Sequence, residues 1–284
     1  MRRMTWFPWG QSETLFSIVA RWHHLAGHPD PRVTAELAFG YERAWAQCHF
    51  ERGLERFCDF AGIDESYLPK LISRRTLMPF GRKFFGLGRS RVDEEFILKG
   101  RFADGGRALE YMGLFPEQGI KLLKCCAVCA ETDRQELGSV TWRLEHQLPG
   151  LLFCNLHGVP LRGAERSSNP HWITASAPQR TIWDSEKNDR LKSIGRFLGL
   201  FHQEEKATRG SVQLLLETLL REAQILPPKR RKSDALRRWW ASAMPAELMQ
   251  AFPSFQWSFV DRVYRSRRPH PFLIAAGLDR LCSR

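Results

Sequence analysis

The sequence of 284 residues lacks any long apolar run. The run over residues 214–220 is interrupted by Glu217 and ends at Arg221, far short of the ~20 residues that a membrane-spanning helix needs. The start of the chain has no apolar segment followed by a small-residue cleavage site, so nothing there directs export. These absences predict a cytoplasmic protein that makes no membrane contact.

Several signatures of catalysis are missing as well. There is no G-x-x-x-x-G-K-[ST] loop for nucleotides and no G-x-S-x-G turn for serine chemistry. His49 and Glu51 match the first half of a zinc deaminase signature, but the second half lacks its proline and lies far along the chain. The short acidic runs at 93–95 and 204–205 are typical of solvated helix faces. We therefore expect a protein that is not an enzyme, and a metal-dependent nuclease is the least favoured alternative.

Acidic residues are the scarcer charge, with 31 Asp and Glu against 43 Lys and Arg, which gives a formal net charge of +12. Such an excess attracts polyanions, DNA among them.

The basic residues concentrate beside the N-terminal helical patterns and in the C-terminal part. The candidate nucleic-acid-binding residues are Arg74, Arg75, Arg82, Lys83, Lys229, Arg230, Arg231, Lys232, Arg237, Arg238, Arg265, Arg267 and Arg268. The alternatives are a solvated basic face or a patch for an acidic protein. Trp239 and Trp240 could stack on bases, although adjacent tryptophans in a helix more often divide between core and surface.

Helical periodicity dominates the two ends of the chain. Apolar residues at three- and four-residue steps predict a first helix, which Ser12 caps and which ends at 27–29. Asp30 and Pro31 form a good cap and first position for a second short helix. Two short helices across a tight turn resemble a helix-turn-helix.

Further helical patterns divide the chain into three parts. They cover residues 41–60 with a break at Gly53, the segment capped by Asp64, and residues 191–201, 212–220 and 234–244. We expect a mainly α protein with a helix-turn-helix-like N-terminal domain (1–110), a small zinc-finger module (111–170) and a basic helical C-terminal domain (171–284).

Two ligand pairs with zinc-like spacing occupy the middle part. Cys126 and Cys129 form a C-x-x-C pair, and Cys154 and His157 form a second pair of the same width. Two such pairs complete a tetrahedral zinc site. Four protein ligands leave no position for water or substrate, so the sequence predicts a structural zinc and no catalytic residue.

Other ligand assignments stay open. Cys125 could replace Cys126 through a three-residue spacer, and His146 could compete with His157. The cysteines could instead be reduced and buried as small apolar residues. The remaining cysteines lack metal-like partners, and we expect them to be packing residues: Cys48, Cys58 and Cys282.

The motifs together resemble the TniQ/TnsD family of transposon target-selection proteins. Residues 12–21 resemble the family's first helix, and the Thr-Leu-Met-Pro-Phe of 76–80 resembles a segment that follows it. The strongest likeness is 126–161, with the cysteine pair, Thr-Trp-Arg, His-Gln-Leu-Pro-Gly and Cys-Asn-Leu-His-Gly in the family's order. A His-Pro-containing helix start at 270–274 resembles one in the TnsD branch.

The resemblance implies a DNA-associated protein that marks an insertion site for a transposase by passing the target to an AAA+ ATPase. Some members read a DNA site themselves, and others dock on an RNA-guided CRISPR effector. Longer site-reading relatives carry further DNA-binding helices, so we expect a partner to supply specificity here. A homodimer is a further option. The alternative from the residues alone is a zinc-finger and helix-turn-helix transcription regulator that binds an operator.

Overall fold

The structure is a computed structural model. It describes residues 7–44, 53–83, 122–165, 171–176, 179–182, 189–204, 211–223, 239 and 271–282. The described part is mainly helical, as the sequence predicts, and none of its helices is long and apolar enough to cross a membrane.

The first helix, α1, spans Leu15–Ala26 and begins two residues later than expected. Its N-cap is Thr14, whose hydroxyl accepts a hydrogen bond from the Ser17 amide at 3.1 Å. The prediction that Ser12 caps this helix is wrong, because the Ser12 hydroxyl donates to Glu145 instead. The helix ends at Gly27, which adopts the left-handed conformation at φ 65°.

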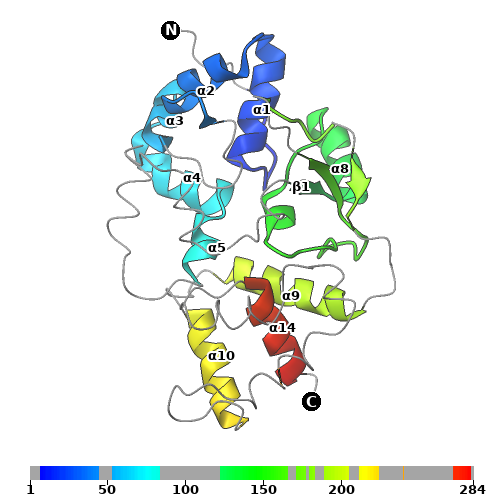
Figure 1. The fold of residues 1–284 in the computed structure, drawn as a ribbon. Coiled ribbons are helices and arrows are strands. Elements are labelled where there is room, and N and C mark those ends of the chain that lie inside the picture. Colours follow the sequence, from blue (N-terminus) through cyan, green and yellow to red (C-terminus); the bar gives the residue numbers. More distant parts are fainter. Residues whose placement is uncertain are drawn as a thin grey trace.

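In the upper left of Figure 1, α2 packs against α1 and α3 packs against α2. Helix α2 spans Pro31–Phe39 with Asp30 as its N-cap, as predicted, and helix α3 spans Leu54–Ala61. Of the helix expected over 41–60, residues 41–44 form a turn, residues 54–60 belong to α3, and residues 45–52 lie outside the described residues. Gly53 precedes α3 at φ 74°, and a β-carbon there would lie 2.2 Å from the Phe39 carbonyl oxygen. Only glycine allows this approach of the two helices.

The N-terminal helices continue through a short turn. Asp64 caps a 3-10 helix at Glu65–Tyr67, and α4 follows directly over Leu68–Arg75. Helix α5 spans Met78–Arg82.

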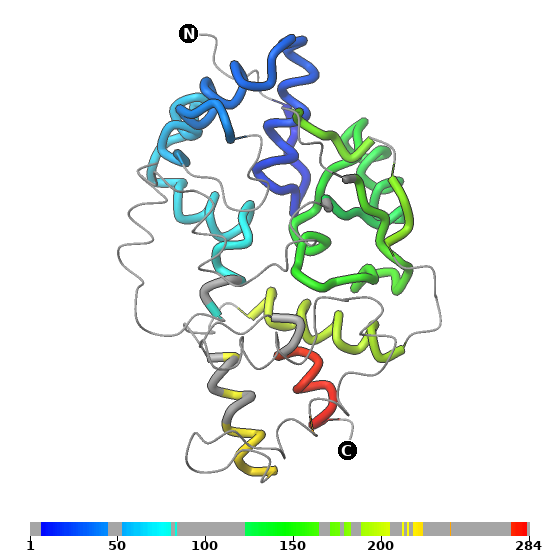
Figure 2. The backbone as a smooth tube through the Cα atoms, in the orientation of Figure 1, coloured from blue at the N-terminus to red at the C-terminus, as the bar shows by residue number. Residues whose placement is uncertain are grey.

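The middle of the chain contains a small antiparallel sheet that the sequence analysis did not predict. Its strands, in order, are β1 (Leu122–Cys125), β2 (Arg162–Glu165) and β3 (Arg180–Thr181). Cys125 pairs with Arg162, and Arg162 with Thr181. Helix α8 (Ala127–Leu137) and a 3-10 helix at Leu144–Gln147 complete this module, which is green in Figure 2.

Backbone hydrogen bonds join α1 to this module. The Thr14 amide donates to the Trp142 carbonyl at 2.9 Å, and the Leu144 amide donates to the Ser12 carbonyl at 2.7 Å. The Trp142 amide donates to the Ser17 hydroxyl at 3.1 Å. The segment entering α1 therefore lies along residues 142–144, and the two parts share one apolar core.

The C-terminal helices lie below the other elements in Figure 1. They are α9 (Asp189–Gln203), α10 (Ser211–Glu222) and α14 (Pro271–Cys282), whose proline belongs to the expected helix start. The ion pair of Arg190 and Asp279 joins α9 to α14 at 3.4 Å. Trp239 is buried, in agreement with a packing role, and the rest of the helix expected over 234–244 lies outside the described residues.

Candidate metal centre

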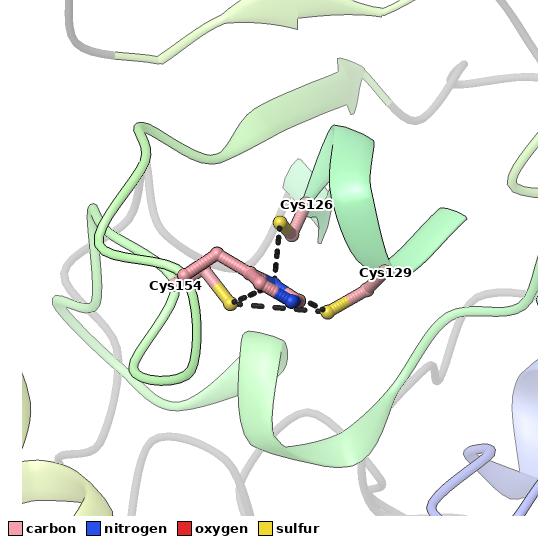
Figure 3. Close-up of side chains that lie close together, drawn as sticks. Cys126, Cys129 and Cys154 are labelled. Atoms are coloured by element: carbon pink, nitrogen blue, oxygen red, sulfur yellow. Dashed lines mark hydrogen bonds between the residues drawn. The ribbon is translucent and has the colours of Figure 1, made fainter. Parts of the chain in front are cut away.

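Two turns of the middle module bring four ligand residues together. Cys126 is the N-cap of α8, and Cys129 lies in the first turn of that helix. Cys154 and His157 lie in a turn closed by two hydrogen bonds, from the Gly158 amide to the Cys154 carbonyl and from the Cys154 amide to the Val159 carbonyl. Figure 3 shows the thiols of Cys126, Cys129 and Cys154 pointing toward one another.

The distances among the four donor atoms fit a tetrahedral metal shell. His157 Nδ1 lies 3.5, 3.3 and 3.5 Å from the sulfurs of Cys126, Cys129 and Cys154. The Sγ atoms of Cys129 and Cys154 are 3.8 Å apart, and all four donors lie within 4.8 Å of one another. Bonds of about 2.3 Å to sulfur and about 2.05 Å to nitrogen at tetrahedral angles imply separations of about 3.8 and about 3.6 Å. The cluster can therefore hold a metal ion of that bond length.

The electrostatics of the thiols also favour a cation. Hydrogen bonds from Cys129 and Cys154 lower the pKa of Cys126, and the same contacts with Cys126 raise the pKa of Cys129 and of Cys154. The three thiols do not ionise together by themselves, because like charges at this distance repel. A bound dication compensates that repulsion and lets all three act as thiolate ligands.

The two alternative metal ligands, Cys125 and His146, lie outside the cluster of four donor atoms. Cys125 is buried on β1, and its thiol donates to Gln179 Oε1 at 2.8 Å. Burial raises its pKa to about 11, so it stays a neutral thiol. His146 is also buried, with Nε2 3.6 Å from Cys154 Sγ, and burial lowers its pKa to about 4. A neutral His146 can donate Nε2–H to the Cys154 sulfur, and it does not belong to the group of four donors within 4.8 Å of one another.

Gln147 of the His-Gln-Leu-Pro-Gly motif, together with Lys124, holds the loop of the metal centre in place. Gln147 Nε2 donates to the Lys124 carbonyl at 2.7 Å, and its Oε1 accepts from the Lys124 amide at 3.0 Å. Lys124 Nζ donates to the carbonyls of Leu148 and Leu151 at 2.6 and 3.1 Å. Burial lowers the pKa of this amine to about 7. Gln147 and Lys124 thus attach the loop to strand β1.

A buried acid that the sequence analysis missed supports the same module. Asp133 on α8 accepts from the Thr141 hydroxyl at 2.6 Å and from Arg143 Nη2 at 2.6 Å. The ion pair fixes α8 against the Thr-Trp-Arg segment. Nothing in the sequence around Asp133 distinguishes it from the exposed acids of the same helix.

The candidate nucleic-acid-binding residues divide into four groups. Arg74 is exposed on α4. Arg75 Nη1 donates to the carbonyls of Gly10 and Glu13, and Lys83 Nζ donates to those of Phe201 and His202, so both are engaged inside the protein. Arg82 lies at the end of α5. The remaining candidates lie outside the described residues: Lys229, Arg230, Arg231, Lys232, Arg237, Arg238, Arg265, Arg267 and Arg268.

The fold and the cluster define a mainly helical protein with a module whose three cysteines and one histidine could hold a metal ion. Residues 6–161 match the TniQ family, which is more than half of the chain and includes all four cluster residues. The protein belongs to the TniQ family, as its motifs predict. A search of curated proteins finds no match.

Proposed function

We propose that this protein is a DNA-associated adaptor that selects targets for transposition and has no catalytic activity of its own. It links a DNA target, directly or through an RNA-guided CRISPR effector, to an AAA+ ATPase and the transposase. The observation that carries this proposal is the match to the TniQ family over residues 6–161. The matched region contains the N-terminal helices and the metal module, which are the two parts that form one core.

The metal of this module is zinc, and its role is structural. Three thiolates and a neutral imidazole are a preferred donor set for zinc, and four protein ligands leave no position for water or substrate. When bound, zinc supplies a cross-link between two turns that are 25 residues or more apart in sequence. Cys126 and Cys129 hold it from α8, and Cys154 and His157 hold it from the loop.

Exposed basic side chains supply affinity for the DNA backbone. Arg74 stands at the end of α4 and faces solvent, and we extend the assignment to the basic clusters at 229–238 and 265–268. Such contacts release condensed counterions, so binding weakens steeply with salt and carries little sequence information. Specificity then comes from a partner.

A reconstitution with purified components tests the proposal. The tagged protein is mixed with a short target DNA, an RNA-guided effector, and the AAA+ ATPase and transposase from its own gene neighbourhood. We expect it to retain the ATPase on target DNA and to leave the DNA uncut when incubated alone with magnesium. Tight binding to an operator without any ATPase recruitment would support a transcription regulator instead, and cleavage by the protein alone would show a nuclease.

A further inference from the structure

Helix α9 presents two glycines, one turn apart, to the loop of the metal centre. A β-carbon on Gly199 would lie 2.5 Å from Asn155 Nδ2, and one on Gly195 would lie 3.0 Å from Leu151 Cδ1 and 3.4 Å from Asn155 Oδ1. Glycine is among the least favourable residues in a helix interior, and its benefit is the close approach of another segment. The face of α9 at 195 and 199 therefore lies in close contact with this loop.

A third contact extends the same face toward the start of the helix. Lys192 Nζ lies over the Phe153 ring, 5.5 Å from its centroid. Residues 192, 195 and 199 share one side of α9 because they are three and four positions apart. Their partners lie at 153, at 151 and 155, and at 155 respectively, so the helix meets the loop at three positions.

The loop in this contact is the one that supplies two of the metal ligands. Asn155 directly follows Cys154 and lies two residues before His157, in the turn that brings both ligands to the cluster. Asn155 thus belongs to the same turn that the metal would close.

Helix α9 also contacts the other parts of the protein. Lys83, which follows α5, donates to the carbonyls of Phe201 and His202 at the C-terminal end of α9, where a cation is favoured. Arg190 pairs with Asp279 of α14 at 3.4 Å. Figure 1 shows α9 between the module of α8 and β1 and the helix α14.

We infer that the loop of the metal centre (residues 151–157) is a latch, a segment that holds α9 in place when the metal is bound. Metal binding would then dock the C-terminal helices against the TniQ region. Closing the loop on the metal places Asn155 and Leu151 against the glycine face. An open loop leaves α9 held by the Lys83 contacts, by the ion pair of Arg190 with Asp279 and by its packing with its neighbours. This inference rests on the proposed metal site, and it adds a conformational consequence to it.

Hydrogen exchange on the full chain tests the latch, with zinc content measured on the same samples. We expect peptides of α9 to exchange roughly tenfold or more faster after chelation, while peptides of α1 keep their protection. Equal loss in α1 and α9 would contradict the latch, because the metal would then support the whole fold. Unchanged α9 protection with the zinc removed would also overturn it. A purified protein that never binds zinc would instead overturn the metal site itself.

A matched pair of variants tests the contact without removing the metal. Gly199→Gln places a side chain in the contact, and Leu200→Gln places the same side chain at a neighbouring position where the leucine is 59% exposed. We expect both to retain one zinc per chain and only Gly199→Gln to raise α9 exchange, by roughly tenfold or more. Equal exchange in the two variants would contradict the latch. Should Gly199→Gln fail to fold, Asn155→Ala replaces it, and unchanged α9 exchange there is the contradicting result.

Discussion

Glu13 and Arg21 form an ion pair inside the protein, with Arg21 Nη1 2.8 Å from Glu13 Oε2 and the Glu13 side chain fully buried. The carboxylate also accepts from the Gly10 amide at 2.9 Å and from the Ser17 hydroxyl at 2.8 Å. Ser17 accepts in turn from the Trp142 amide of the metal module. This network joins the start of α1 to the module, so its charges serve the fold rather than a ligand.

Removing one partner of this pair should be costly. We expect Arg21→Met to lower the free energy of unfolding by about 3 to 5 kcal/mol, because it leaves the Glu13 carboxylate buried without its cation. The control is Arg134→Met, which breaks an ion pair with Glu131 in which both side chains are more than half exposed. That change should cost under about 1 kcal/mol in the same denaturant titration. Similar costs for the two variants would contradict the burial argument.

Two neighbouring arginines on α4 should separate stability from DNA binding. Arg75→Ala removes hydrogen bonds to two carbonyls and should lower the free energy of unfolding by about 1.5 to 3 kcal/mol. Arg74→Ala should change it by less than about 0.5 kcal/mol, because the side chain is exposed.

The same two variants, Arg74→Ala and Arg75→Ala, also test the proposed contacts with DNA phosphates. Arg74→Ala should reduce the slope of log affinity for DNA against log salt by about 1. Arg75→Ala, measured where it is still folded, should leave that slope unchanged. A slope that responds to Arg75 and not to Arg74 would contradict the assignment.

Acid should destabilise the protein partly through His23. This side chain is 6% exposed, its Nδ1 lies 2.7 Å from the Thr34 hydroxyl, and burial together with the neighbouring His24, His28 and His171 lowers its pKa from 6.5 to about 4. The unfolded chain therefore binds a proton that the folded chain refuses between pH 6.5 and 4. The contribution of His23 to the free energy of unfolding is complete above pH 6.5 and is lost as the pH falls to about 4.

A variant isolates this effect from other titrating groups. His23→Asn should reduce the slope of unfolding free energy against pH by up to about 1.4 kcal/mol per pH unit between pH 6 and 4.5. Denaturant titrations of the variant and the parent across this range give the two slopes. Parallel curves would show that His23 takes up its proton equally in the folded and unfolded chain.

Two left-handed glycines should differ in their tolerance of a side chain. Gly138→Ala should cost about 1 to 2 kcal/mol, since φ is 70° and nothing lies within 4 Å of the added carbon. Gly53→Ala should cost about 3 kcal/mol or more, because the carbon also meets the Phe39 carbonyl at 2.2 Å. Thermal unfolding of both variants checks the order, and equal losses would mean that α2 and α3 adjust freely.

The features that depend on neighbouring residues alone, such as helix caps, could be predicted from the sequence. The caps at Asp30 and Asp64 and the stop at Gly27 follow from residue type alone. The four cluster residues follow from spacing. The sheet was missed because strands of two to four residues are too short to show a two-residue period.

Contacts between residues far apart in sequence account for the other differences between the predictions and the structure. Ser12 looks like a helix cap, but its carbonyl and hydroxyl are taken by residues 144 and 145. Arg74 and Arg75 are equivalent in sequence, and only the position of α4 against Gly10 turns one of them inward. Lys83 likewise reads as a surface cation until α9 is placed beside it.

Zinc K-edge absorption on the purified protein reports the identity and distance of the metal's neighbours. We predict one zinc per chain with three sulfur neighbours at about 2.3 Å and one nitrogen at about 2.05 Å. Cys154→Ser should lose the metal or one sulfur from the spectrum, whereas Cys125→Ser, which removes a buried thiol outside the cluster, should leave it unchanged. A protein without zinc, or a spectrum with fewer than three sulfur neighbours, would contradict the site of three cysteines and one histidine.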